Sequence, residues 1–389
     1  MQAKDSEAAE RIVPHVWRFD AGPGEPVEGY IGLSPNCRYT VEQGYGFLAG
    51  GEVYGRDRSD MLAAEDADGI SHVQSSFCIP LGASFALDVP DGCYQVKLTL
   101  GDLLTATHTV IRAYGSRLML PPVRTQAGQV LEVLFAVSVR GGQLQLSFSG
   151  RAPRLNHLEI TAVPEVLKLV LAGDSTVTDQ PANGYPYAGW GQMLPARFRH
   201  DVCVDNHAMS GRSSKSFIQE GHLDTIRDVL HPGDFLFIQF GHNDEKTDTA
   251  RHTDPFTTYK QCLTEYIMTA RDREAIPVLI TPVSRRSFNR QGELEDTHGD
   301  YLIAMRELAA EQQVPLIDLA DRTRQLLEQL GPEQSRNLFV QLHPGEYMNF
   351  PVGAQDNTHF QEYGAAQIAD LVTQSIRDLN LHPLTMYLR

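Results

Sequence analysis

The segment Leu167-Lys168-Leu169-Val170-Leu171-Ala172-Gly173-Asp174-Ser175-Thr176 decides the fold of this chain. It begins as a short, almost continuous apolar run, which is typical of a strand that is buried in a parallel sheet. It then changes at once to Gly-Asp-Ser-Thr, where the glycine permits a tight turn. Ligands of open α/β sheets bind just beyond the carboxyl ends of the strands, so Ser175 lies where a nucleophile is expected. For so short a motif, a turn that merely caps a helix is the alternative.

The composition is that of a soluble globular protein with an acidic balance. Its 389 residues favour two or three domains, and the apolar content of 42% and charged content of 21% are ordinary values. The net charge of −16 argues against nonspecific binding to nucleic acid or to an anionic membrane. A local basic patch would still accept an anionic substrate. No stretch is long and apolar enough to span a bilayer.

The N-terminal segment and the cysteines bear on the compartment. Residues 1–10 are polar and acidic and lack the apolar core of a signal peptide, which predicts a cytoplasmic protein. An exported protein whose signal has been trimmed is the alternative. The five cysteines show no metal-ligand spacing, so we expect no metal site and free thiols in a reducing compartment. A Cys78–Cys93 disulfide stays open if the protein is exported.

Residues 15–163, after a tail at residues 1–14, are predicted to form an antiparallel β-sandwich or jelly roll. Short β-type runs are bounded by Gly, Pro and Asp, and Pro-Asp-Gly (90–92) and Arg-Gly-Gly (140–142) stand where hairpin turns are expected. The predicted strands include residues 84–89, 93–100, 130–139 and 144–148.

Four short sequence segments in this region resemble segments of known protein domains. They are Phe-Asp-Ala-Gly-Pro-Gly (19–24), Gly-Tyr-Gly-Phe (44–47), Pro-Asp-Gly-Cys-Tyr (90–94) and Leu-Gly-Asp (100–102). They resemble the galactose-binding-like and malectin-like sandwiches, and this resemblance implies a carbohydrate-binding domain. Its candidate sugar-stacking residues are Tyr30, Tyr39, Tyr45 and Phe47. We favour packing in the core for these four, because aromatic residues dominate cores as well as sugar sites.

Residues 164–389 change to an alternation of strands and helices, which is typical of βαβ units and a parallel sheet. Five apolar runs suit an α/β, flavodoxin-like doubly wound sheet. Asp254 and Pro255 offer an N-cap and a first helical residue. The predicted strands are residues 167–172, 202–205, 235–240, 277–282 and 314–319, and the predicted helices are residues 255–275, 300–312 and 359–379.

Polar segments follow the first three of these strands, and another lies near the end of the chain. They are Gly-Asp-Ser-Thr (173–176), Asn-His-Ala-Met-Ser-Gly-Arg-Ser (206–213), Gly-His-Asn-Asp (241–244) and Asp-Asn-Thr-His-Phe (356–360). Because the carboxyl ends of parallel strands meet at one edge of a sheet, we expect all four segments to collect there.

This constellation resembles the SGNH (GDSL-type) hydrolases. Ser175, Gly211, Asn243 and His359 match the four invariant residues of that family in identity and order, and Asp356 precedes the histidine by three positions as it does there.

A threonine at position 176 replaces the leucine that is usual in the first block of the family. This form, with Gly-His-Asn-Asp and Asp-x-Thr-His-Phe, is similar to the rhamnogalacturonan acetylesterase branch, and Thr-Pro-Val-Ser-Arg-Arg-Ser-Phe (281–288) also fits it. The resemblance implies a serine carbohydrate esterase that needs no cofactor and removes acetyl groups from pectin-type sugars through an acetyl-serine intermediate.

Acyl transfer assigns a role to each matched residue. Ser175 attacks the acetyl carbonyl, His359 takes and returns the proton, and Asp356 orients the imidazole. The oxyanion donors are the backbone N–H groups of Ser175 and Gly211 and the side-chain amide of Asn243.

The surroundings of His359 suggest a helix start. Thr358 and Gln361 stand in capping-box spacing, which predicts that His359 lies in the first turn of the last helix. The positive end of a helix disfavours imidazolium and Asp356 stabilises it, so we expect a base that titrates near the working pH.

Further candidate residues surround this set. Asp174 and Asp244 are predicted to brace the loops of the site, with exposed turn carboxylates as the alternative. Arg285 and Arg286 follow the fourth strand, and their guanidinium groups suit galacturonate carboxylates, with ion pairs in a solvated loop as the alternative.

Two aromatic residues are further candidates. Trp190 is a candidate sugar platform, although a packing role is the interpretation that we favour. Tyr347 is expected at the pocket rim.

Two other functions stay open at this point. One is an SGNH esterase that acts on acetylated xylan or on small acyl esters. The other is a non-catalytic carbohydrate-binding protein. For all but the small esters, the expected partner is an acetylated oligosaccharide or polysaccharide, with no nucleic acid and no membrane, and the sequence leaves the oligomeric state open.

Overall fold

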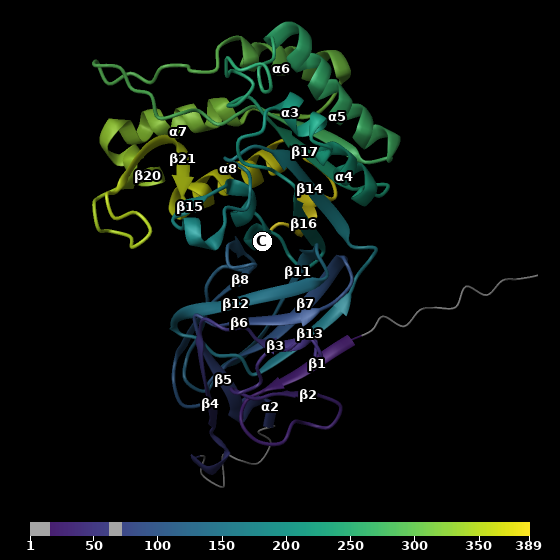
Figure 1. The fold of residues 1–389 in the computed structure, drawn as a ribbon, viewed down its shortest axis with the longest axis vertical. Helices are drawn as coiled ribbons and strands as arrows, with labels where there is room; N and C mark the ends of the chain where they lie inside the picture. Colours follow the sequence, from purple (N-terminus) through teal and green to yellow (C-terminus); the bar gives the residue numbers. More distant parts are fainter. Residues whose placement is uncertain (1–15, 62–71) are drawn as a thin grey trace, which may run out of the picture.

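The computed structural model describes residues 16–61 and 72–389 of the chain. The predicted tail at residues 1–14 lies outside the described residues, as does the acidic segment at residues 1–10. Figure 1 shows an all-β unit at the bottom and an α/β unit at the top, with the C-terminus at their junction. There Arg389 donates from Nη2 to the carbonyl of Leu134 in the β-unit, at 3.0 Å.

The β-unit is a sandwich of two main sheets, as predicted. The two turns predicted at residues 90–92 and 140–142 are present, but neither makes a hairpin, because each carries the chain from one sheet to the other. The second contains two glycines with φ of 84° and 77°. One sheet has the order β11 (Val130–Val139), β7 (Gly92–Gly101), β13 (His157–Ala162), β1 (Val16–Ala21) and β2 (Ile31–Leu33). The other has the order β10 (Val123–Thr125), β8 (Thr107–Ala113), β12 (Gln143–Ala152), β6 (Ser84–Asp88) and β3 (Tyr45–Phe47), with β9 (Arg117–Leu118) beside β8. A separate pair is β4 (Glu52–Asp57) with β5 (Ser76–Leu81), which the short helix α2 (His72–Ser75) precedes.

Two of the four candidate aromatic residues pack in the core of the sandwich. Phe47 is completely buried, and the ring of Tyr45 lies 5.2 Å from that of Phe19. The ring of Tyr30 lies 4.8 Å from that of His157. Core packing, the interpretation we favoured, therefore describes Phe47 and Tyr45. Tyr30 is half-buried and lies outside this core, and the hydroxyl of Tyr39 lies 3.1 and 3.0 Å from the two carboxylate oxygens of Asp88.

The cysteines form no disulfide. All five are free thiols, including Cys78 and Cys93. The alternative of a bridge between these two is not realised in the structure.

The α/β unit contains a five-stranded parallel sheet with the doubly wound order expected from the sequence. The first strand lies between the second and the third, which is the flavodoxin-like arrangement. The order is β16 (Val202–Asn206), β14 (Leu167–Gly173), β17 (Phe235–Gln239), β18 (Ile276–Ile280) and β19 (Leu316–Ile317).

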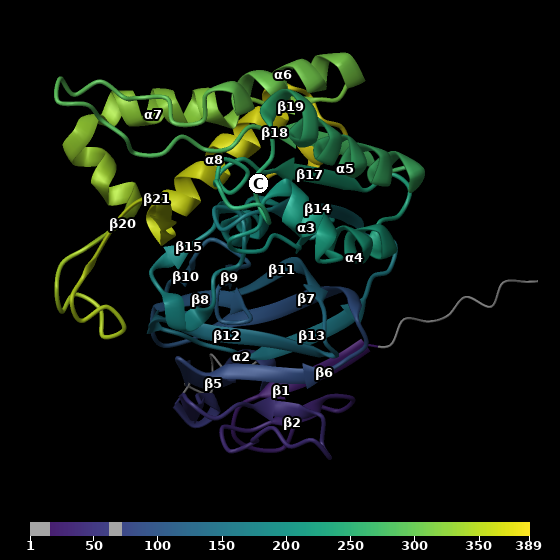
Figure 2. The ribbon, with the colours of Figure 1, turned by 45° about the horizontal axis from the view of Figure 1, so that its top comes forward.

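Alternate residues of β14 enter two different cores, which explains its continuous apolar run. Leu169 and Leu171 pack with residues of α7 and α8. Val170 and Ala172 pack with residues of α3 to α6 on the opposite face. Figure 2 shows these helices around the sheet. They are α3 (Ser214–Gln219), α4 (His222–Val229), α5 (Lys260–Asp272), α6 (Asp300–Gln312), α7 (Leu319–Gln334) and α8 (Glu362–Asp378).

One predicted helix boundary is wrong. Residues 354–361 form the strand β21 (Ala354–Gln361), and α8 begins only at Glu362. The strand pairs with β15 (Tyr187–Ala188) on one side and with β20 (Phe339–Leu342) on the other. The side chain of Gln361 donates to the carbonyl of Asn337 and closes no capping box with Thr358. His359 therefore lies in a strand, and the helix-end argument for its titration does not apply.

Ion pairs join the two units. Arg117 of β9 donates from Nε and Nη2 to Asp179 Oδ2, at 3.0 and 2.7 Å, and from Nη1 to Ser138 Oγ, at 2.8 Å. Arg112 of β8 donates from Nη2 to both carboxylate oxygens of Glu362, at 2.8 and 2.9 Å. In Figure 2, β9 and β11 lie on the side of the sandwich that faces the α/β unit.

Candidate active site

The carboxyl edge of the parallel sheet brings three of the four polar segments together. Ser175 follows β14, Gly211 follows β16 and Asn243 follows β17. His359 reaches the same place by another route, because β21 pairs antiparallel with β15. All four residues line one cavity of about 440 Å³.

Two short hydrogen bonds connect the serine, the histidine and the aspartate. Ser175 Oγ lies 2.7 Å from His359 Nε2, and His359 Nδ1 lies 2.7 Å from Asp356 Oδ2. The other carboxylate oxygen, Oδ1, accepts the backbone N–H groups of Thr358 and His359, at 2.8 and 2.9 Å. Both carboxylate oxygens are thus occupied, so the carboxylate fixes the orientation of the imidazole.

The protein environment keeps Asp356 ionised. Burial by itself raises the pKa of this carboxyl, but the hydrogen bonds and charge of His359, together with the backbone donors, lower the pKa to about 2. Tyr187 adds a third kind of donor, because its hydroxyl lies 3.2 Å from Asp356 Oδ2. The tyrosine itself stays protonated, since burial and the neighbouring carboxylate raise its pKa to about 12.

Uncommitted N–H donors face the serine. Within the described chain, no hydrogen bond occupies the backbone N–H groups of Ser175 and Gly211. Gly211 has φ of +80°, a conformation that side chains disfavour. Asn243 donates from Nδ2 to the carbonyl of Arg212 at 3.1 Å, which leaves its second amide N–H for a ligand. Three residues that line one cavity thus keep N–H donors available to a ligand, which is what an oxyanion hole requires.

The two predicted bracing aspartates lie beneath the cavity and are completely buried. Asp174 Oδ1 accepts the N–H and the hydroxyl of Thr176, at 2.9 and 2.8 Å, and its Oδ2 lies 3.3 Å from His242 Nδ1. Burial raises the pKa of Asp174, but His242 and these hydrogen bonds bring it below its ordinary value.

Asp244 joins the loops that follow β16 and β17. It accepts the hydroxyl of Ser214 at 2.5 Å and that of Thr253 at 3.1 Å. Burial raises its pKa to about 7, against the effect of these hydrogen bonds. The side chains of both aspartates therefore form hydrogen bonds that fix loops of the site, as predicted. The alternative, exposed carboxylates in turns, is wrong for both.

The predicted arginines occupy different places. Arg285 lines the catalytic cavity, and its Nη2 lies 2.9 Å from Glu245 Oε2. Arg286 is absent from the residues that line this cavity and donates instead to Ser335 Oγ at 3.2 Å and Asn357 Oδ1 at 3.1 Å.

Neither predicted aromatic contact lies in the cavity. Trp190 is completely buried and donates from Nε1 to Gln239 Oε1 at 2.9 Å, so the sugar platform is wrong and the packing alternative holds. Tyr347 lies in the loop between β20 and β21 with its ring 5.8 Å from that of Tyr185, and it does not line the cavity.

Four lining residues escaped the sequence analysis. Tyr187 begins β15, Gln180 lies in the segment between β14 and β15, and Lys246 and Arg251 lie in the loop after Asn243. Gln180 donates from Nε2 to the carbonyl of Ser175 at 2.9 Å, which fixes the turn that carries the serine. Only Lys246 left a signal in the sequence, as a cation close to a matched motif.

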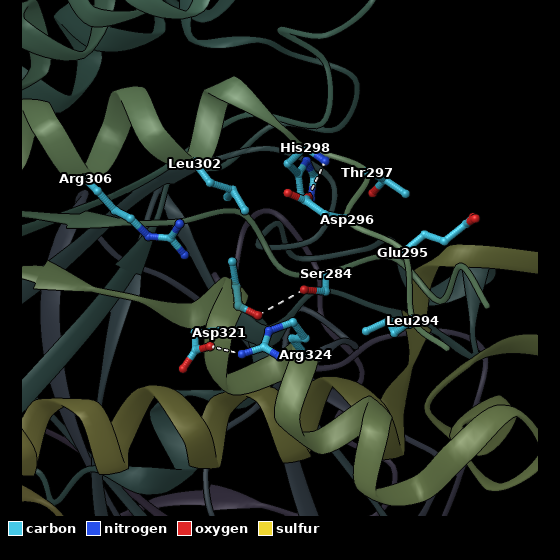
Figure 3. A pocket seen from close by; sticks show the side chains of 11 residues that line it. Ser284, Leu294, Glu295, Asp296, Thr297, His298, Leu302, Arg306, Asp321 and Arg324 are labelled. Atoms are coloured by element: carbon cyan, nitrogen blue, oxygen red, sulfur yellow. Dashed lines mark hydrogen bonds and ion pairs between the residues drawn. The ribbon is translucent and has the colours of Figure 1, made fainter. Parts of the chain in front are cut away.

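A second cavity, of about 390 Å³, lies between α6, α7 and the loop after β18 (Figure 3). His298 lines it, and the ring of this histidine lies 4.7 Å from that of His242, which lines the catalytic cavity. Figure 3 shows Arg324 directed at Asp321. Ser284 also lines this cavity, but its hydroxyl donates to the carbonyl of Ala320 at 3.0 Å and His298 Nε2 lies 2.9 Å from the carbonyl of Val283, so the two residues form no nucleophile–base pair.

Residues 16–61 and 72–389 contain neither a metal-binding cluster nor a membrane-spanning helix. There, no group of three or more His, Cys, Asp or Glu side chains is placed to hold a metal ion. No helix of this same part is long and apolar enough to cross a membrane.

Two family models match the chain, one in each unit. Residues 17–152 match the beta-agarase/YXIM esterase-like, galactose-binding domain-like family. Residues 171–349 match the GDSL-like lipase/acylhydrolase family.

Relatives from Bacillus subtilis extend these matches. The rhamnogalacturonan acetylesterase RhgT is 47% identical over 215 residues, which is 55% of this chain and 91% of that protein. The uncharacterised esterase YxiM is 30% identical over 345 residues, which is 85% of this chain and 87% of that protein. The crystal structure of the YxiM protein superposes with a TM-score of 0.51 at 27% identity, covering 95% of this chain and 99% of that one.

Proposed function

The chain belongs to the GDSL-like lipase/acylhydrolase family, whose members hydrolyse carboxylic esters, and we propose that it removes acetyl groups from rhamnogalacturonan polysaccharides or oligosaccharides. The observation that carries the reaction is the pair of 2.7 Å hydrogen bonds from Ser175 through His359 to Asp356. The likeness to RhgT, which is named a rhamnogalacturonan acetylesterase, supports the substrate.

The first half of the reaction forms an acetyl-enzyme. His359 Nε2 takes the proton of Ser175 as Oγ attacks the acetyl carbonyl, and Asp356 stabilises the imidazolium that forms. The oxyanion receives hydrogen bonds from the N–H groups of Ser175 and Gly211 and from Asn243 Nδ2. The imidazolium then gives its proton to the departing sugar hydroxyl, which leaves acetyl-Ser175.

The second half returns the enzyme to its starting state. His359 takes a proton from water, which attacks the acetyl carbonyl, and the same three donors stabilise the second oxyanion. Collapse of this intermediate releases acetate, and Ser175 regains its proton from His359. No step requires a cofactor.

Acetate release tests the reaction and the substrate together. We would measure it from acetylated rhamnogalacturonan, acetylated xylan and 4-nitrophenyl acetate, with Ser175→Ala as control. We expect preferential release from rhamnogalacturonan and a loss of about 10⁴-fold or more in the variant. Preferential release from xylan would overturn the substrate, and retained activity in a folded Ser175→Ala variant would overturn the mechanism.

A further inference from the structure

Cationic side chains gather at the catalytic cavity of a chain whose net charge is −16. Lys246, Arg251 and Arg285 line the cavity, and no lining residue in the described ranges is an aspartate or a glutamate. We call these three residues the cationic rim. A negatively charged ligand in this cavity would therefore contact cationic side chains, although the chain as a whole is acidic.

Arg285 is the member of the rim that is already committed to the protein. Its Nη2 lies 2.9 Å from Glu245 Oε2, and its Nη1 donates to Thr297 Oγ1 at 3.0 Å. Its side chain is 19% exposed. Arg285 is thus held in place by these contacts, and the neighbouring glutamate largely balances its positive charge.

The other two members keep donors free. Arg251 donates from Nε and Nη2 to Asp248 Oδ2, at 3.0 and 2.7 Å, which leaves its Nη1 without a partner in the described chain. The Lys246 side chain is exposed, and no hydrogen bond or ion pair to its ammonium group occurs within the described ranges. The Lys246 ammonium group and the Arg251 Nη1 can therefore each donate a hydrogen bond to one of the two oxygens of a bound carboxylate.

The loop that carries these donors also carries an oxyanion donor, so their positions are linked. The backbone N–H of Lys246 donates to the carbonyl of Asn243 at 3.2 Å. Beyond Arg251, the N–H of Thr253 donates to the carbonyl of Asp244 at 3.1 Å, which closes the loop on itself. A carboxylate bound by Lys246 and Arg251 therefore lies on the Asn243 side of the acetyl group. In an acetylated uronic acid, the ester and the carboxylate are carried at different positions of one sugar ring, which matches two linked subsites.

The second cavity offers an internal contrast. Its arginines are paired, with Arg306 Nε 2.9 Å from Asp318 Oδ2 and Arg324 Nη2 2.5 Å from Asp321 Oδ1. Glu295 and other carboxylates line it, as Figure 3 shows. Arg251 is paired with Asp248 in the same way, at 2.7 Å. The catalytic cavity differs because it is lined by Lys246, which has no ion pair within the described ranges, and by no carboxylate of those ranges.

We propose that Lys246 and Arg251 form a carboxylate-binding subsite, through which the enzyme selects sugars with a free uronate over their methyl esters and over neutral sugars. This proposal rests on the proposed function for the identity of the bond that the enzyme cleaves. Binding of the carboxylate can be tested separately, because a uronate without an acetyl group should occupy the same subsite and act as an inhibitor.

The test uses digalacturonate and its methyl ester as inhibitors of 4-nitrophenyl acetate hydrolysis by the full chain. We expect the acid to inhibit the wild type at least about tenfold more strongly than the ester, since hydrogen bonds to charged groups are the strong ones. Lys246→Gln is expected to weaken inhibition by the acid about tenfold and inhibition by the ester little. Arg251→Gln is expected to act in the same direction, and added salt is expected to weaken inhibition by the acid.

Lys97→Gln on β7 is the matched control, because it makes the same change of net charge on the sandwich and is expected to alter neither inhibition constant. Equal inhibition by acid and ester would overturn the subsite, as would no inhibition by the acid. A Lys246→Gln variant that weakens both inhibitors equally would also overturn it. If the acid inhibits as expected while acetylated rhamnogalacturonan releases no acetate, the proposed substrate fails and the subsite stands.

Discussion

The domain interface and the catalytic cavity both contain cationic side chains, but they use them in opposite ways. At the interface, the Arg117 side chain is 4% exposed, and its three guanidinium nitrogens all bind Asp179 or Ser138. At the cavity, Lys246 is exposed and its ammonium group has no partner within the described residues. A buried, fully paired charge joins two units, whereas an unpaired charge beside a nucleophile remains available to a ligand.

Two consecutive residues connect these regions. Asp179 binds Arg117 and also accepts the side-chain amide of Asn206 at 2.9 Å. The next residue, Gln180, donates to the carbonyl of Ser175. The sandwich therefore supports the turn that carries the nucleophile, whether or not it binds sugar itself.

The largest expected effect is a loss of catalytic rate when a hydrogen-bond donor of the oxyanion hole is removed. Asn243→Ala removes a side-chain donor of the oxyanion hole and is expected to lower kcat by about 10²–10³-fold with little change of KM, because the bond forms in the transition state. Steady-state kinetics with 4-nitrophenyl acetate measure this. Asn36→Ala, an exposed site on the sandwich, is the control. A loss smaller than about threefold would remove Asn243 from the oxyanion hole.

At the interface, the expected loss is in stability. Arg117→Ala leaves Asp179 without its cation and is expected to lower the free energy of unfolding by about 2–3 kcal/mol. This is less than for a fully buried pair, because the Asp179 side chain is 22% exposed. Urea unfolding measures it, with Arg151→Ala, an exposed arginine, as control. If Lys246→Gln destabilised the protein as much as Arg117→Ala, the proposed difference would be wrong. Lys246 would then stabilise the fold as Arg117 does, instead of remaining available to a ligand.

Asp244 adds a third kind of charged group to this comparison, because it is completely buried and no ion pair to its carboxylate occurs in the described chain. Its folded-state pKa of about 7 exceeds the ordinary value of 3.8, so the folded protein retains a proton that the unfolded chain has lost. This contribution to stability is complete below pH 3.8 and is lost as the pH rises to about 7, by up to about 1.4 kcal/mol per pH unit.

Asp244→Asn cannot titrate and is expected to remove that slope. The measurement is the urea midpoint of both proteins between pH 5 and about 7.5. The difference between wild type and variant isolates Asp244 from other titrating groups, and two parallel curves would contradict a proton held at this site.

The parallel sheet and most of the site were predictable, because short stretches of sequence determine each strand and the polar segment that follows it. The run from Leu167 to Ala172 is apolar on both faces of the strand because it enters two cores. Ser175, Gly211 and Asn243 each follow a strand, so the topology alone brings them to one edge. The helix Asp300–Gln312 has the predicted bounds, since its pattern is local.

Features that depend on distant pairing were not predictable. The spacing of Thr358 and Gln361 imitates a capping box, but the hydrogen bonds of β21 with β15 and β20 make a strand there. Tyr187 reaches Asp356 only through this sheet.

Mass spectrometry of the enzyme during turnover tests the central claim most directly. The wild type would be mixed with 4-nitrophenyl acetate, quenched in acid within the first turnovers and digested. The account predicts one added acetyl group on the peptide that contains Ser175, and none on that peptide in Ser175→Ala. Turnover by the wild type with no acetylated peptide, or with the acetyl group on a different residue, would contradict the acetyl-serine mechanism.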